Sequence, residues 1–255
     1  MSRSSDVQLV GISVPSEAKA AAVFIHGIAG HYLDSWGEKN CPATFLRRLS
    51  VDCPSVAVFS ADYPSGMDRL VDDDDLTLRR LVEGWANVLG ESVMNHYRAV
   101  AVIGFCLGGL LTTMAIRQWF VNDAKWAQCL ASGDGRLMLF LLDTLHQVPN
   151  KEDHKEGLVG MRSAFQCGAE EFQENVNFWR GLMKQEFPRE RLPVDAFALL
   201  SEGESFVKSW SPHAHLPSHR VHQTKVSHEH LVRPPTGGAF FPYDFVASKI
   251  RQFTV

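Results

Sequence analysis

Val-Ile-Gly-Phe-Cys-Leu-Gly-Gly, residues 102–109, is the stretch that decides how this chain folds. An apolar, β-branched run leads into it, and a helical pattern that extends to about residue 120 follows it. A strand that turns sharply into a helix is the setting of a nucleophile elbow, whose apex side chain projects from the fold. The three glycines of the stretch suit so tight a turn, because a Cβ atom at these positions would clash. Cys106 stands at the apex and is the candidate nucleophile.

The position of Cys106 predicts its chemistry. At the amino end of a helix, the helix dipole favours a thiolate over a thiol. The backbone amide of Leu107 can donate a hydrogen bond to the oxyanion that forms when the sulfur attacks a carbonyl group. Serine is the usual residue at such an apex. The competing interpretation is a glycine-rich strand–helix turn that carries a buried structural thiol.

Two further segments stand in the order that such an elbow requires. Before it, residues 22–30 run as an apolar strand into His26-Gly27, and the amide of Ile28 is the best-placed second donor to an oxyanion. After it, residues 226–234 supply His228 near the C-terminus, where the order nucleophile, acid, histidine places the general base. His228 is favoured over His230 because of the expected strand end and the spacing to Pro234.

Together these motifs resemble the α/β-hydrolase fold family, and within it the lipase-like esterase group. That group has an F-V-H-G-x-x-G segment followed by a Trp, which residues 24–30 and Trp36 match, and a strand that ends in a T-P-H-like turn, which residues 139–146 match. An H-x-x-apolar-x-x-P motif is matched by residues 228–234. The resemblance covers residues 20–60, 95–150 and 193–250.

The chain departs from this group at two positions. Cys106 replaces the nucleophilic serine, and Leu145 stands where proline is usual. Elbows of the form G-x-C-x-G-G also occur in dienelactone-hydrolase-like members of the fold, so the cysteine does not by itself indicate an inactive protein.

The resemblance implies a mostly parallel central sheet with helices on both faces, and a hydrolase of carboxylic esters or thioesters that works through an acyl-enzyme. Cys106 is then the nucleophile, His228 the base, and the amides of Ile28 and Leu107 the oxyanion hole. For the acid, relatives carry a carboxylate three residues before a valine, and Glu204 fits this spacing. The alternatives are Glu202 and Asp143, which follow two different strands.

The predicted elements alternate along one domain, residues 1–255, which is typical of a parallel sheet covered by helices. Strands are expected near 7–13, 20–25, 55–61, 99–104, 136–142, 194–200 and 220–226, and helices near 41–50, 76–95, 108–121, 162–186 and 241–253. Four aspartates at 72–75 suit the amino end of the second helix. The amphipathic stretch 144–192 is either a helical cap over the site or an ordinary pair of crossover helices.

A substrate pocket for a small-molecule or lipid-like ester is expected from the side chains of His26, Tyr32, Trp36 and Phe105. A net charge of −4 and a pI near 6.2 argue against a nucleic-acid partner. The five cysteines, with neither a signal peptide nor a membrane-spanning run, favour a reducing compartment, the cytoplasm by default. Six histidines fall within residues 213–230 without a recognisable ligand spacing, so no metal and no cofactor are predicted.

Three functions therefore compete. The first is a hydrolase or acyltransferase with a cysteine nucleophile. The second is a serine hydrolase whose nucleophile has been exchanged for cysteine at position 106. The third is a non-catalytic α/β-hydrolase that binds a ligand or a partner, and it alone would leave His228 dispensable.

Overall fold

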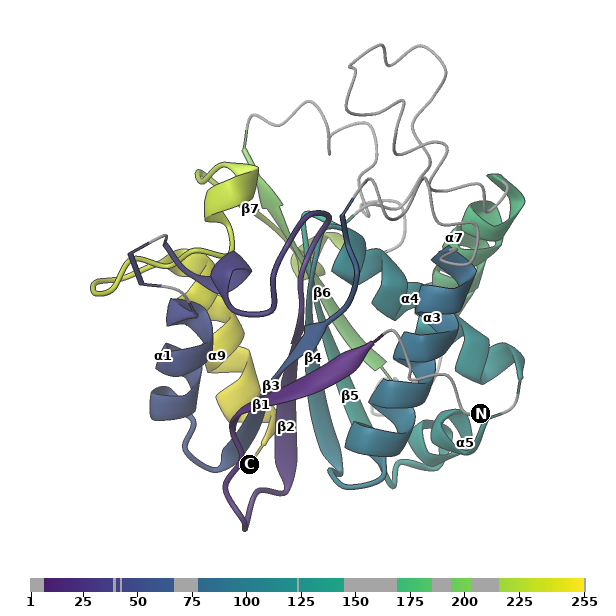
Figure 1. The fold of residues 1–255 in the computed structure, drawn as a ribbon. Helices are drawn as coiled ribbons and strands as arrows, with labels where there is room; N and C mark the ends of the chain where they lie inside the picture. The colour runs from purple at the N-terminus through teal and green to yellow at the C-terminus, as the bar shows by residue number, and fades with distance from the viewer. Residues whose placement is uncertain are drawn as a thin grey trace.

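The computed structural model describes residues 7–38, 40–41, 43–66, 78–122, 124–144, 169–184, 194–202 and 216–254. Its centre is a seven-stranded sheet of order β1-β3-β2-β4-β5-β6-β7 (Figure 1). β1 is antiparallel to β3, and the other neighbouring strands are parallel. The strands are β1 Gln8–Ser13, β2 Ala20–Ile25, β3 Val56–Asp62, β4 Ala99–Phe105, β5 Arg136–Leu142, β6 Val194–Ser201 and β7 Val221–Thr224. All seven expected strands and the predicted fold class are confirmed.

The central strands are apolar along their whole length because both faces of the sheet are covered. All six residues of β2 are buried, as are all but the first of β5. Such continuous apolar runs are typical of parallel strands between two helical layers.

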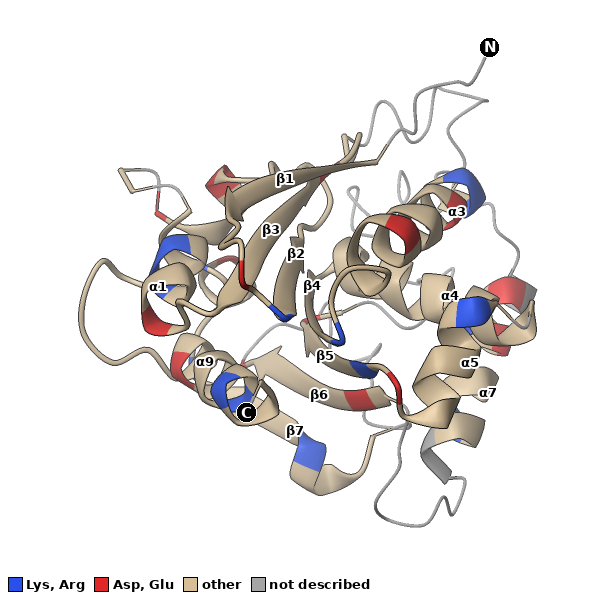
Figure 2. Ribbon diagram, turned by 90° about the horizontal axis from the view of Figure 1, so that it is seen from below, with Lys and Arg blue, Asp and Glu red and all other residues tan. Residues whose placement is uncertain are grey.

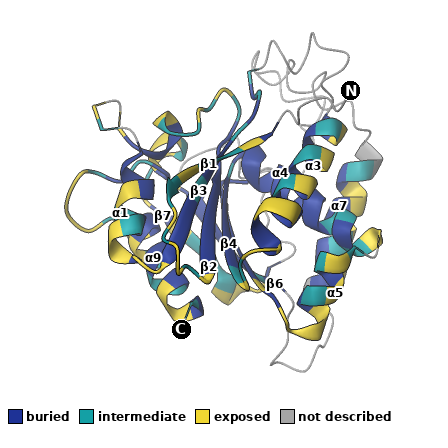
Figure 3. Ribbon diagram, turned by 60° about the horizontal axis from the view of Figure 1, so that its bottom comes forward, coloured by how far each residue is buried: buried dark blue, intermediate teal, exposed yellow. Residues whose placement is uncertain are grey.

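Helices α1 (Thr44–Asp52) and α9 (Phe241–Phe253) cover one face, and α3 (Leu78–Asn87), α4 (Leu107–Val121) and α7 (Ala169–Lys184) cover the other (Figures 1 and 3). Each layer has its own apolar core against the sheet. Positive and negative residues are interspersed along the helices and at the ends of the strands (Figure 2). Within the described residues, no helix is long and apolar enough to cross a membrane.

The helix expected over 76–95 differs from the prediction. It consists of α3 followed by a π-helix, η2 (Val88–Met94), in which Gly90 packs against the indole of Trp126. A Cβ atom on Gly90 would come within 2.6 Å of that ring, so the contact needs a glycine. Trp126 belongs to α5 (Lys125–Ser132), a helix that the sequence pattern did not predict. The aspartates at 72–75 lie outside the described residues.

Within the stretch 144–192, the described helix α7 packs along α4. The side chain of Asn175 donates a hydrogen bond to the Thr113 hydroxyl (3.1 Å), and the indole N–H of Trp179 donates to the Thr113 carbonyl (3.1 Å). These buried bonds place α7 as a crossover helix between β5 and β6. The rest of the stretch lies outside the described residues, so a cap formed by it stays a prediction.

Candidate active site

The predicted site residues gather at the carboxyl edge of the sheet. His26 directly follows β2, Cys106 follows β4 and Asp143 follows β5. His228 begins the short 3-10 turn η5 (His228–His230), which comes after β7. Because parallel strands end at the same edge, residues far apart in sequence meet there.

Cys106 lies at a strained turn between β4 and α4, as the sequence predicts. Its φ of 51° and ψ of −115° are unusual for a residue with a side chain. A Cβ atom on Gly104 would lie 2.5 Å from the Cα of Gly109, and one on Gly109 would overlap the Thr144 hydroxyl. These glycines therefore allow the helix to start against the strand that precedes it.

His228 and Asp143 form the central contact of the site. Nδ1 of His228 lies 3.0 Å from Oδ2 of Asp143, whose side chain is fully buried. The other carboxylate oxygen accepts a hydrogen bond from the backbone N–H of Ser201 (2.8 Å). Asp143 is thereby fixed through both oxygens, and it can fix the tautomer and the orientation of the imidazole.

The imidazole of His228 also interacts electrostatically with the Cys106 side chain. Burial lowers the pKa of His228, but the hydrogen bond to Asp143 and the interaction with Cys106 raise it, to about 10 overall. The phenyl ring of Phe105 lies 4.6 Å from the imidazole between ring centroids and covers it. The site therefore favours a protonated His228 between two acidic groups at neutral pH.

The neighbouring histidine and the other two candidate acids are placed differently. His230 is exposed, and its Nδ1 lies 2.8 Å from the Ser227 hydroxyl. Glu202 is exposed after β6, and Glu204 lies outside the described residues. The described partner of His228 is therefore Asp143, one of the two alternatives to Glu204 that the sequence left open.

The loop after β2 lies directly against the elbow. A Cβ atom on Gly27 would come within 2.9 Å of the Cβ of Cys106, and one on Gly108 would come within 2.5 Å of the His26 carbonyl. The Ile28 amide is on this loop, and the Leu107 amide is the first of α4, with no helical carbonyl to bond. Both predicted oxyanion donors thus belong to segments that contact each other beside Cys106.

Comparison with solved structures identifies the architecture. The chain is similar to a lipase-esterase related protein from Clostridium acetobutylicum (11% identity, TM-score 0.55, 97% of this chain and 99% of that one). It is also similar to a hyperthermophilic esterase from Pyrobaculum calidifontis (13%, TM-score 0.57, 97% and 82%) and to a carboxylesterase from Nitrososphaera gargenis (11%, TM-score 0.56, 99% and 97%). The chain has the α/β-hydrolase fold. No family model and no curated protein matches its sequence.

The four side chains expected to line a substrate pocket fall into two groups. Phe105 covers His228, and Tyr32 is half-buried on the loop after β2, so both remain candidates for substrate contact. Trp36 instead lies in the core, fully buried, with its ring 5.0 Å from that of Phe24. His26 is also fully buried, and burial lowers its pKa to about 4, so it is neutral at physiological pH.

Two residues next to the site carried no motif in the sequence. Tyr63 and Ser65 follow β3 at the same edge of the sheet, and both are buried. The Tyr63 hydroxyl donates a hydrogen bond to the His26 carbonyl (2.6 Å). The only signal available beforehand was their position just after a predicted strand.

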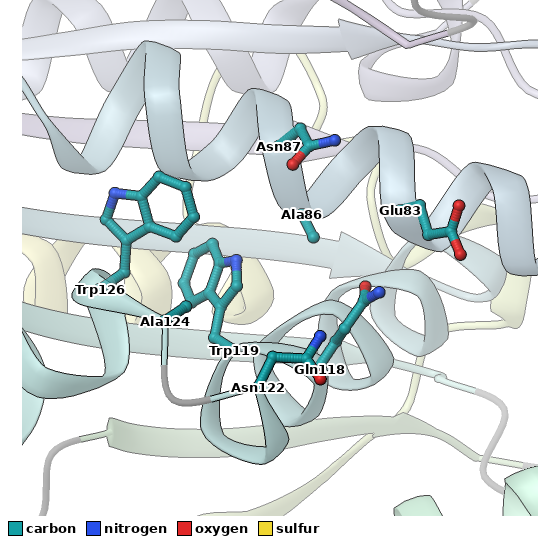
Figure 4. A pocket seen from close by; sticks show the side chains of 8 residues that line it. All are labelled: Glu83, Ala86, Asn87, Gln118, Trp119, Asn122, Ala124 and Trp126. Atoms are coloured by element: carbon teal, nitrogen blue, oxygen red, sulfur yellow. The ribbon is translucent and has the colours of Figure 1, made fainter.

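A separate hollow of about 320 Å³ lies between α3, α4 and the start of α5, away from Cys106 (Figure 4). Its walls combine two indole rings with carboxamide side chains and one carboxylate. The lining residues are Glu83, Ala86, Asn87, Gln118, Trp119, Asn122, Ala124 and Trp126. None of them belongs to the candidate site at the carboxyl edge of the sheet.

Proposed function

We propose that this protein cleaves carboxylic esters or thioesters through an acyl-enzyme formed on Cys106, with His228 as the base and Asp143 as the acid. The observation that carries the proposal is the position of His228, whose Nδ1 lies 3.0 Å from a buried carboxylate and whose imidazole interacts electrostatically with the thiol at the elbow. The esterases that share the fold support the same class of reaction. The expected substrate is a small-molecule or lipid-like ester.

In the first half-reaction, the Cys106 thiolate attacks the carbonyl carbon. A C–S bond forms, and the carbonyl electron pair moves to oxygen, where the amides of Ile28 and Leu107 donate hydrogen bonds. Such a donor is typically worth ~3 kcal/mol of barrier. As the oxyanion collapses, the bond to the leaving group breaks, and the His228 imidazolium gives that group its proton.

In the second half-reaction, water attacks the thioester. His228 is neutral at this point, because it has given its proton to the leaving group, and it accepts a proton from water. Hydroxide oxygen bonds to the acyl carbon, the C–S bond breaks, and the carboxylic acid leaves. The proton on His228 and the restored thiolate return the site to its starting state.

The proposed acid of the triad is Asp143 and not Glu204, which the sequence favoured. A triad acid needs a fixed carboxylate at Nδ1 of the histidine, and Asp143 provides one that is buried and held by the Ser201 amide.

Intact mass spectrometry with p-nitrophenyl acetate tests the proposal. We expect a mass gain of one acetyl group that maps to Cys106, with a burst of nitrophenol equal to the enzyme concentration. His228→Ala should abolish this acylation and His230→Ala should retain it. Absence of acetylation of the unaltered protein by both p-nitrophenyl acetate and S-phenyl thioacetate would overturn the proposal and favour a ligand-binding role.

A further inference from the structure

The loop after β2 is held by a set of hydrogen bonds that the reaction scheme does not yet use. The His26 carbonyl accepts a bond from the Tyr63 hydroxyl (2.6 Å). The Gly27 carbonyl accepts two bonds, from Nδ1–H of neutral His26 (2.9 Å) and from the Gly30 amide (3.2 Å). Both peptide carbonyls that precede the Ile28 amide are therefore fixed.

Ser65 fixes the far end of the same loop. Its backbone carbonyl accepts a hydrogen bond from the Ala29 amide (2.8 Å), and its hydroxyl donates to the Gly30 carbonyl (3.2 Å). Ala29 has a φ of 52°, a left-handed conformation that is unfavourable for alanine and needs support from its surroundings. The Ser65 bonds on either side supply that support.

The ring of Tyr63 adds a packing contact to the same loop. It stacks on the His26 imidazole with 4.4 Å between ring centroids and 11° between planes. Tyr63 is 4% exposed, and burial raises its pKa well above the ordinary value, so the hydroxyl keeps its proton and remains a donor.

Ile28 is the residue around which these bonds are arranged. Among the described residues, the backbone bonds of the loop use the amides of Ala29 and Gly30 but not the Ile28 amide. That amide lies in a loop whose Gly27 contacts Cys106 closely. An oxyanion donor stabilises a transition state most when it is fixed beforehand and has no competing partner.

We propose that Tyr63 and Ser65 are positioning residues that hold the loop of residues 27–30 so that the Ile28 amide meets the oxyanion formed at Cys106. This inference rests on the proposed acyl transfer. Neither side chain is assigned contact with the substrate. Their effect is exerted through the His26 and Gly30 carbonyls that they bind.

The proposed role of Tyr63 and Ser65 affects acylation of Cys106 but not its alkylation. Acylation by an ester passes through an oxyanion, so it needs the Ile28 amide in place. Alkylation by iodoacetamide is a displacement at a saturated carbon and forms no oxyanion. It needs only the Cys106–His228 pair. Loosening the loop should therefore slow acylation and leave alkylation unchanged.

The test uses Tyr63→Phe, which removes one hydroxyl and keeps the stacked ring, and Ser65→Ala. With p-nitrophenyl acetate we expect the acylation rate of the burst and kcat to fall about 10- to 100-fold in each variant, with KM within about twofold, because both half-reactions pass through an oxyanion and small misplacement of a catalytic donor has effects of this order. The iodoacetamide rate at Cys106 and the Tm should stay close to those of the unaltered protein. Tyr97→Phe, at a tyrosine that packs on Phe59 away from the site, is the matched control and should leave kcat unchanged.

Two results would overturn the proposal that Tyr63 and Ser65 position the loop. One is a Tyr63→Phe variant with unaltered kcat while the parent protein acetylates Cys106. The other is an equal loss of acylation and alkylation, which would assign Tyr63 to the thiol–imidazole pair. Failure of the parent protein itself to acetylate would count against the proposed function, so the two failures are distinguishable.

Discussion

Cys106 and Asp143 both have a positive φ, which few residues with side chains adopt. Their φ angles are 51° and 41°, and each residue directly follows a central strand. Such conformations cost on the order of 1–3 kcal/mol each and persist only where the surrounding structure enforces them. At Asp143, this conformation places the carboxylate against the imidazole of His228.

The strain at Cys106 should lower the free energy of unfolding of any variant that keeps a Cβ atom at this position. We expect Cys106→Gly to be more stable than Cys106→Ala by about 1 kcal/mol or more, because glycine adopts a positive φ without a Cβ penalty. Both variants lack the thiol, so their comparison isolates the backbone. Urea unfolding measures the difference, and equal stability would show that the turn is relaxed.

The choice of acid is testable at the same scale. We expect Asp143→Asn to lower the acylation rate about 10²-fold or more, since the amide cannot hold the imidazolium or its tautomer in the same way. Glu204→Gln should retain the parent rate. The reverse ranking in single-turnover kinetics with p-nitrophenyl acetate would return the role to Glu204.

At the scale of the element, α4 can pack closely on the sheet because two residues of its first turn are glycines. Gly108 faces the end of β2, and Gly109 faces the buried Thr144. The helix can therefore approach the sheet closely, so its first amide lies beside the loop after β2. A bulkier residue would displace the helix and the elbow together.

A pair of glycine-to-alanine substitutions tests this packing. Gly109→Ala should destabilise the protein by about 2 kcal/mol or more, because its Cβ would overlap the Thr144 hydroxyl. Gly181→Ala on α7, where a Cβ meets nothing within 4 Å, should stabilise it by up to about 1 kcal/mol through helix propensity. Urea midpoints measure both, and effects of the same sign would contradict the argument.

At the scale of the molecule, stability should depend on the proton held by His228. Its pKa is about 10 in the folded protein against an ordinary 6.5. The folded state therefore binds this proton more tightly, and the resulting stability is complete below pH 6.5 and is lost as the pH rises through about 10. We expect the Tm difference between the parent and His228→Gln to narrow between pH 7 and pH 10.5. His230→Gln should show no such trend, and a difference that stays constant for His228→Gln would contradict a raised pKa.

The fold could be predicted from the sequence because its signals are local. Each central strand is a continuous apolar run, and the elbow glycines mark their own turn. The acid could not be chosen, because Asp143 reaches His228 only through the packing of the turn η5 onto the end of β5. Trp36 was expected to line the pocket but lies in the core. The sequence around an aromatic residue outside the strands does not distinguish these two positions.

Two backbone hydrogen bonds link the site to the sheet in a way that affects how the protein loses function. The Cys106 N–H donates to the Leu142 carbonyl (2.9 Å), and the Asp143 N–H donates to the Leu199 carbonyl (2.9 Å). The ladder of the sheet thus continues through the two residues, so neither can fray while the central strands remain paired. Inactivation by heat should then coincide with cooperative melting of the sheet, without an earlier inactive native-like state, and the amides of Cys106 and Asp143 should exchange with solvent only through global opening.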